Sequence, residues 1–426
     1  MNPVAVAAKG KGAMSAVRRA GAIGAHYGAS PKRMERRLAD VFALVERVGG
    51  AATLPVTAAA LARHPAAIAR FADLGIEFPV HGYYHVDHIA LDALTQDRQL
   101  AEARRLFLRH GLPAAGFRAP YLRWNEGTMH ALVENGYAYD SSQSMHWPID
   151  PERETEGYRR GLEFYTSLPA DAHPVVPRIE GSLVRIPCCL PDDESVVDRL
   201  ALPDADAIAT LWVDVWRRTH ARGDLFTMQV HPERIGPCGP GIAAVLEEAA
   251  HARPGVWIAR LGEVATWWRE RTAATVRAEP AGEGRWTIAC EGPDGLTPLV
   301  RGGAVTGAGP WADGYDRPAA TTFEVTSIAR PFVGIDPASP DSLAAFLREQ
   351  GYVVEDAASP GTHTVHLRRD RFERTDELPL LAELDRADGP LVRLGRWPGG
   401  AKSALAVTGD VDALTVWDYA ARFVGR

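Results

Sequence analysis

Cysteine is scarce in this 426-residue sequence, which contains only Cys188, Cys189, Cys238 and Cys290. None of them forms a C-x-x-C pair or a spacing typical of a disulfide framework. Proteins stabilised by disulfides or by cysteine-ligated zinc are therefore not expected. Reduced thiols favour a cytoplasmic location.

Long apolar runs are also missing. No uncharged apolar stretch of about 18 residues occurs, so we expect no transmembrane helix. The first 29 residues form an N-terminal extension without the continuous apolar core of a signal peptide, and Arg18 and Arg19 stand where that core would lie. The sequence therefore predicts no export signal.

An excess of positive charge is absent as well. The formal net charge is -7, from 54 acidic and 47 basic residues mixed along the chain. Without a basic stripe, nucleic acid and anionic membrane surfaces are not expected as partners. The sequence also lacks internal repeats and low-complexity tracts, which excludes repeat architectures.

The sequence does contain a long α/β pattern. From residue 30 to about 274, helix-period stretches alternate with short apolar runs, which is typical of repeated βα units around a parallel sheet. Ser30-Pro31 is a helix start signal, and the helix it opens should stop at Gly49-Gly50. Residues 275–395 are instead rich in Gly and Pro and predict a separate β-rich, α+β accessory module with one helix near 339–351. Residues 396–426 turn apolar again and predict a further strand.

Four strand candidates of the α/β region end in polar residues that can take part in catalysis. In parallel β/α folds such residues meet at one face, where active sites are built. They are His81, Arg118, Asp140 and His231.

Two histidines separated by three residues, His81 and His85 in VHGYYH, suit a zinc-like ion. Asp410 and Asp412 in TGDVDA follow the apolar run ALAV. One carboxylate could complete a two-His, one-Asp site, and the other could act as the general base on an activated water. The alternatives are packing histidines, and a turn in which the aspartates bond their own backbone.

Three more residues suit acyl chemistry. Arg118 in GFRAPY can hold a carboxylate, and the backbone amide after Pro120 can bind an oxyanion. His231 in QVHP suits a general acid whose imidazole is oriented by a carboxylate such as Asp140. A surface arginine and a structural histidine are the alternatives. Several aromatic residues could either carry sugar rings or pack the barrel rim: Tyr83, Tyr84, Tyr121, Trp124 and Trp147.

Taken in order, VHGYYH, FRAPY, YDSS, the RIP segment and QVHP resemble the motifs of the polysaccharide deacetylase (NodB-homology, carbohydrate esterase 4) family, over residues 30–273. The resemblance implies a deformed β/α barrel that binds zinc or another divalent ion and removes N-acetyl groups from amino sugars. By this match His81 and His85 are metal ligands, and Arg118 positions the base. Tyr121 lends its amide to the oxyanion hole, and His231 is the general acid oriented by Asp140.

The family's first motif is displaced. Its aspartate pair should precede Ser30, but residues 16–28 contain no acid, whereas SALAVTGDVDAL at 403–414 resembles the missing strand. By this match Asp410 is the base and Asp412 the third metal ligand. We therefore expect a circularly permuted barrel in which this strand lies beside AATLPV at 51–56 and the accessory module is an insertion. A truncated second copy is the rival explanation, and whether the motif acts in its own chain or in a swapped partner stays open. Gly82 departs from the family, which more often has Ser or Thr there.

The sequence thus predicts a metal-dependent hydrolase that removes an N-acyl group, in the first place N-acetyl, from an amino sugar or glycoconjugate. Zinc is the expected ion, and cobalt, nickel, manganese or iron would also suit the ligands. The alternatives are a hydrolase of another C–N bond, in a ureide or cyclic amide, and a catalytically inert glycan-binding homologue. Homo-oligomerisation stays open.

Overall fold

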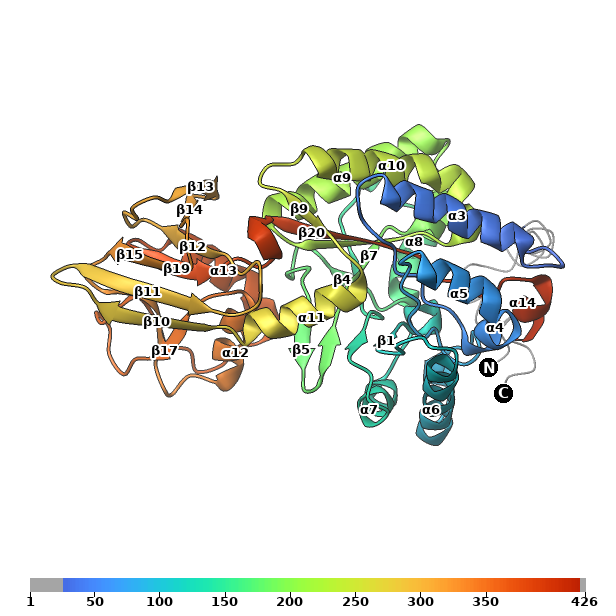
Figure 1. Cartoon of the computed structure of the whole chain (residues 1–426), viewed down its shortest axis with the longest axis horizontal. Coiled ribbons are helices and arrows are strands. Elements are labelled where there is room, and N and C mark those ends of the chain that lie inside the picture. The colour runs from blue at the N-terminus through green and yellow to red at the C-terminus, as the bar shows by residue number, and fades with distance from the viewer. Residues whose placement is uncertain (1–25, 422–426) are drawn as a thin grey trace.

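The computed structural model describes residues 26–421 (Figure 1). The predictions for residues 1–25, including the absence of an export signal, lie outside this range. Between residues 26 and 421, no helix is both long and apolar enough to cross a membrane.

The first helix shows how the sequence pattern produces the local structure. α3 spans Lys32–Glu46 and follows Pro31, as expected from the start signal. Its buried residues recur every three or four positions, so one stripe of the helix faces the core: Met34, Leu38, Val41 and Val45. Gly49 follows in the left-handed region with φ +68°, where glycine has no steric penalty.

The other helices of this part lie around a set of parallel strands. They are α4 Ala58–Arg63, α5 Pro65–Asp73, α6 Ala93–Arg109, α7 Glu126–Glu134, α8 Glu156–Phe164, α9 Ala205–Arg222, α10 Ile235–His251 and α11 Leu261–Thr272. Side-chain caps begin several of them; Asp92, for example, accepts a hydrogen bond from the Thr95 amide at the start of α6.

A series of parallel pairings joins segments that are far apart in the sequence. β20, Ser403–Thr408, lies between β8, Leu225–Gln229, and β9, Val256–Ile258, and is parallel to both. Single parallel bridges continue the series from the end of β20 through residues 53–56 and 77–80 to β1. The bridges join Thr53 to Thr408 and Glu77, Val56 to Val411 and Val80, and Val80 to Phe117.

The remaining strands are short. β1 Gly116–Phe117 pairs with β2 Tyr139–Asp140, which pairs with β6 Leu183–Arg185. β7 Cys188–Leu190 pairs with β3 Ser144–His146, which pairs with β4 Leu168–Pro169. β7 lies next to β8: Cys189 Sγ on β7 is 3.7 Å from the Leu225 carbonyl oxygen on β8. β5 Arg178–Glu180 adds an antiparallel edge to β6.

Some apolar runs of the α/β region do not form single continuous strands. The run LVRIPCC at 183–189 forms β6 and β7, which belong to different sheets and are separated by Ile186 and Pro187. AATLPV and IEFPV form isolated bridges instead of continuous strands. Pro55 and Pro79 lie in these segments, and proline has no N–H to donate to a ladder.

Residues 275–395 form a distinct set of sheets at the opposite end of the molecule from α3 to α6 (Figure 1). β10 Thr275–Pro280, β11 Arg285–Glu291 and β15 Thr322–Thr326 are antiparallel, as are β13 Gly309–Ala312, β14 Tyr315–Arg317, β12 Pro298–Arg301 and β19 Leu391–Leu394. β17 Val354–Asp356, β16 Arg330–Ile335 and β18 His363–Leu367 are parallel, and α12 Asp341–Glu349 and α13 Glu377–Arg386 pack on them. After β19 the chain returns through β20 and ends its described part in α14, Val416–Ala421.

All six residues of β20 are buried. Leu405 and Val407 belong to one apolar cluster and Ala404 and Ala406 to another, so β20 is an interior strand and not an edge.

Candidate metal centre and active site

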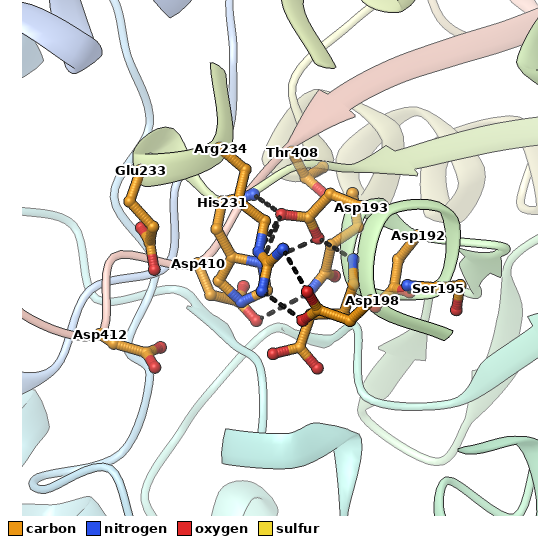
Figure 2. A network of polar contacts seen from close by, with 12 residues as sticks. Asp192, Asp193, Ser195, Asp198, His231, Glu233, Arg234, Thr408, Asp410 and Asp412 are labelled. Atoms are coloured by element: carbon orange, nitrogen blue, oxygen red, sulfur yellow. Dashed lines mark hydrogen bonds and ion pairs between the residues drawn. The ribbon is translucent and has the colours of Figure 1, made fainter. Parts of the chain in front are cut away.

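The end of β20 carries two carboxylates that point the same way. Asp410 and Asp412 follow the strand, and Val411 between them bridges to Val56 and is fully buried. Side chains two positions apart on an extended chain project to the same side. Figure 2 shows both carboxylates beyond the end of β20, with His231 beside Asp410.

Asp412 lies between the two histidines of VHGYYH. Its Oδ1 is 3.1 Å from His85 Nε2 and 3.5 Å from His81 Nε2. One ligand atom from each of the three residues lies within 4.8 Å of the others. The predicted metal ligands are therefore brought together, although Asp412 lies 327 positions after His85 in the sequence.

The orientation of His81 suits a metal ligand. Its Nδ1 is 2.8 Å from the Arg118 carbonyl oxygen, so Nδ1 carries the proton and donates it there. Its Nε2 is buried and has no hydrogen-bond partner among residues 26–421. A backbone carbonyl that fixes the histidine tautomer in this way is common in metal sites. Two imidazoles and a carboxylate around a buried acceptor nitrogen fit a divalent ion such as zinc.

Asp410 is held by a buried guanidinium. Its Oδ1 lies 3.2 Å from Arg118 Nη1, and its Oδ2 accepts a hydrogen bond of 2.9 Å from Gln229 Nε2. Its Oδ2 also lies 3.8 Å from His81 Nε2. Asp410 is thus fixed beside the three candidate ligands without belonging to the closest set.

Arg118 is fully buried, and its guanidinium links its own segment to three others. Besides Asp410, it donates to Gln229 Oε1 at 2.8 Å, Thr408 Oγ1 at 2.9 Å, and the Ser141 carbonyl and hydroxyl oxygens at 3.0 and 2.9 Å. A buried charge of this kind is tolerated because it is paired and hydrogen-bonded. The alternative of a surface arginine is excluded.

Gly409 allows β20 and β8 to end together. A Cβ atom on Gly409 would lie 1.7 Å from the Val230 carbonyl oxygen, which no side chain could accommodate without moving the backbone. The Val230 amide donates to the Thr408 carbonyl at 2.8 Å. This close contact places Asp410 next to His231, the residue after Val230.

His231 is oriented by Asp193, a residue that the sequence analysis did not single out. His231 Nδ1 lies 2.9 Å from Asp193 Oδ1, and the His231 amide donates to Asp193 Oδ2 at 2.9 Å (Figure 2). Burial opposes the charged imidazole, but the Asp193 carboxylate outweighs it and raises the pKa of His231 well above its usual value. An imidazole that stays protonated at neutral pH is a proton donor.

The prediction that Asp140 orients His231 is wrong. Asp140 Oδ2 accepts a hydrogen bond of 2.7 Å from Arg185 Nε, its register partner on β6. The Ser142 hydroxyl donates to its other oxygen and accepts the Ala119 amide at 2.8 Å. Asp140 therefore supports the backbone of the Arg118–Tyr121 loop. The acidic pair in LPDDES, directly after the apolar run ending at Leu190, was the signal for Asp193.

Tyr121 lies in a left-handed backbone conformation with φ +61°, inside a turn at Pro120–Leu122. A non-glycine residue there is strained, and such strain gathers at functional sites. Its ring meets His85 edge-on at 4.4 Å between centroids. Among the other aromatic candidates, Trp147 is buried in the core, and the Trp124 ring is covered by the Arg185 guanidinium at 4.1 Å.

Two further ionisable residues lie near the site. Burial lowers the pKa of His88 to about 3, so this fully buried imidazole is neutral, and it packs on Phe117. Figure 2 shows Glu233 on the Asp412 side of His231, where it accepts a hydrogen bond of 2.7 Å from the Tyr27 hydroxyl. Burial raises the pKa of Glu233.

The family model described as polysaccharide deacetylase matches residues 28–139, so the predicted family resemblance is confirmed. No curated protein sequence matches the chain. The match covers VHGYYH and FRAPY and ends at Tyr139, the first residue of YDSS. The later motifs lie outside it.

Several solved structures are similar to the chain. A Mycobacterium smegmatis protein assigned as a polysaccharide deacetylase is 22% identical over 54% of this chain and 76% of its own, with a TM-score of 0.43. A Pseudomonas aeruginosa PAO1 protein with the same assignment is 18% identical over 55% and 73%, with a TM-score of 0.44. Puue allantoinase is 19% identical over 55% and 72%, also with a TM-score of 0.44.

Proposed function

We propose that this chain is a metal-dependent N-deacetylase that hydrolyses the acetamide of an acetylated amino sugar or glycoconjugate. The observation that supports it is the convergence of His81, His85 and Asp412 within 4.8 Å, beside a buried Asp410 and the imidazole of His231. These five residues come from three segments of the chain and supply the ligand, base and acid types that amide hydrolysis needs.

His81, His85 and Asp412 would hold the ion, which we take to be zinc; cobalt, nickel, manganese and iron also accept this ligand set. When bound there, a divalent ion would polarise the amide carbonyl and make water more acidic.

Asp410 accepts the proton of the attacking water in this proposal. Its carboxylate is fixed by Arg118 Nη1 and Gln229 Nε2, so it cannot turn away from the site. A base held in a single orientation removes an entropic cost from the reaction. The backbone amide of Tyr121 then stabilises the oxyanion, and the strained turn at Tyr121 positions this amide.

His231 protonates the departing amine. The proton on Nδ1 is committed to Asp193, so Nε2 delivers the proton to the leaving group. Because Asp193 raises the pKa of His231, the imidazole holds this proton at the pH at which Asp410 is needed as a base.

We further propose that the barrel is circularly permuted, with residues 403–414 acting as its first strand. The parallel bridges of Thr408 to Thr53 and of Val411 to Val56 support this, because they put the last strand beside the AATLPV segment. Residues 30–274 and 396–426 would then form one barrel, and residues 275–395 an inserted module. A truncated second copy would not place Asp412 against His81 and His85 of the same chain.

Acetate release from N-acetylated chitooligosaccharides, by protein with and without added zinc, tests this function. Zinc-dependent release by the wild type and none by Asp412→Ala is the expected result. Ammonia release from ureides without acetate release would replace it by the alternative C–N hydrolase. Absence of both activities, in protein shown to hold the ion, would favour an inert glycan-binding homologue.

A further inference from the structure

A cavity lies far from the candidate metal centre, at the other end of β9 and β20. It has a volume of about 640 Å³ and is lined by residues 253–257, by Pro310, Trp311 and Arg317, and by residues 398–401. We call it the 253/311/399 cleft. Its wall at Ala401 is nine residues before Asp410, which corresponds to about 30 Å along an extended strand. The cleft is therefore distinct from the proposed active site.

The charge of the cleft is one-sided. Arg253 and Arg317 line it, and no lining residue is acidic. Neither guanidinium forms an ion pair within the described range 26–421. Lys402, just beyond the lining residues, is already neutralised by Asp313 at 2.8 Å. Two unneutralised guanidinium groups at one cavity favour a ligand with a carboxylate, sulfate or phosphate group.

Two indole rings provide flat faces in the same cleft. Trp311 is fixed by a hydrogen bond of 2.7 Å from its Nε1 to the Gly400 carbonyl oxygen. Trp257 packs against Trp267 and Trp397 with ring centroids 6.3 Å apart in both pairs. Both indoles remain partly exposed. An indole has a wide apolar face and a polar edge, and saccharide rings pack on such faces.

The cleft is also preorganised. Arg317 Nη1 donates to the Gly399 carbonyl oxygen at 3.1 Å, and a Cβ on Gly400 would come within 2.4 Å of the same nitrogen. Glycine at position 400, with φ +80°, thus leaves room for the guanidinium against the backbone. Pro254 and Pro310 stiffen the other two walls. A rigid site loses little entropy when a ligand binds.

We propose that the 253/311/399 cleft binds an acidic saccharide, with sugar rings on Trp257 and Trp311 and the acidic group on Arg253 and Arg317. The choice of a saccharide over another planar anion rests on the proposed function. The cleft then anchors an acidic glycan while the site at Asp412 works on acetylated sugars elsewhere on the same molecule.

Isothermal titration of the full-length protein tests this inference, without turnover and in the presence of a chelator. The probes are hexasaccharides of hyaluronan, polygalacturonate and heparin, with neutral chitohexaose and inorganic phosphate for comparison. We expect at least one acidic hexasaccharide to bind and to quench tryptophan fluorescence. It should bind at least tenfold more tightly than chitohexaose, and the affinity should fall with salt.

Variants locate the binding. Arg317→Gln and Trp311→Ala should each weaken it at least tenfold, while Arg277→Gln, an exposed arginine of the same module paired with Glu291, should not. Trp311 lies in β13, so Trp311→Ala could disturb that strand. In that event Arg317→Gln still tests the binding site. If no acidic hexasaccharide binds, or if phosphate alone binds as tightly, the inference is overturned. Because the titration needs no turnover, a failed binding assay and a failed deacetylase assay are distinguishable.

Discussion

The carboxylate of Asp193 binds both the imidazole and the backbone of His231, at 2.9 Å in each case. Asp193 is itself fully buried, and its Oδ1 also accepts the Glu194 amide at 2.9 Å. This carboxylate therefore controls the position of the proposed general acid and its protonation together.

Asp193→Asn should shift the alkaline limb of the activity profile to lower pH. Without the carboxylate the pKa of His231 falls, so the imidazole loses its proton earlier as the pH rises. We expect kcat at pH 8 to fall by about 100-fold, and the loss to be smaller at pH 6. The pH dependence of kcat for acetate release measures this. Asp198→Asn, which removes an exposed carboxylate bonded to Arg234, is the control and should keep the wild-type profile. An unshifted limb in Asp193→Asn would show that His231 is not the acid.

The same pair should make stability depend on pH in one direction. The folded-state pKa of His231 is raised, so the stabilisation is complete below the unfolded value of about 6.5 and is lost as the pH rises through the folded value. The free-energy difference between wild type and Asp193→Asn should therefore be largest near pH 6 and decrease toward pH 10. Urea unfolding at several pH values tests this. A difference that grows with pH would contradict it.

Asp412→Ala should abolish tight metal binding. Losing one of three ligands costs more than losing an outer-shell partner, which already lowers affinity by about 10- to 100-fold. Metal analysis after dialysis should find about one zinc per chain in the wild type and none in the variant. Asp294→Ala, an exposed aspartate outside the site, should keep the metal. Full metal content in Asp412→Ala would show that Asp412, and with it the segment after β20, does not belong to the metal site.

Arg118→Met should destabilise the fold as well as abolish activity. The change leaves Asp410 buried without its cation, which typically costs about 3–5 kcal/mol. Urea unfolding measures the loss. Arg109→Met, at an exposed arginine paired with Glu102, should change stability by less than about 0.5 kcal/mol. If both variants are equally stable, the buried network around Arg118 is not formed in solution.

Leu405→Ala tests whether β20 is part of the barrel core. Leu405 is fully buried in this strand, and removing such a side chain costs about 2–5 kcal/mol. Ile328→Ala is the matched control, because Ile328 is 98% exposed and should tolerate the change within about 0.5 kcal/mol. Equal unfolding midpoints would mean that the strand is dispensable.

The sequence predicted the positions of His81, Arg118, Asp410, Asp412 and His231 because a simple rule applies to them. Each follows a buried run, and parallel strands place such residues at one face. The start signal of the first helix at Pro31 and its stop signal at Gly49 are also local features of the sequence.

The partner of His231 could not be predicted in this way. Asp140 is the register partner of Phe117, so it projects to the same side as Phe117 and away from the side that Arg118 takes one residue later. Register depends on loop lengths and packing, and a shift of one residue reverses every side chain. Asp193 comes three residues after the end of β7 at Leu190, and its contact with His231, 38 residues later, depends on the tertiary structure.

The order of the ligands along the chain has a consequence for biosynthesis. Asp412 is synthesised more than 300 residues after His85, which at ordinary translation rates takes about 15–60 seconds. During that time the nascent chain carries two histidines without the carboxylate that completes the site. Under the proposed function, metal loading would wait for the final strand, and a chain interrupted before β20 would leave the ribosome without both Asp410 and Asp412.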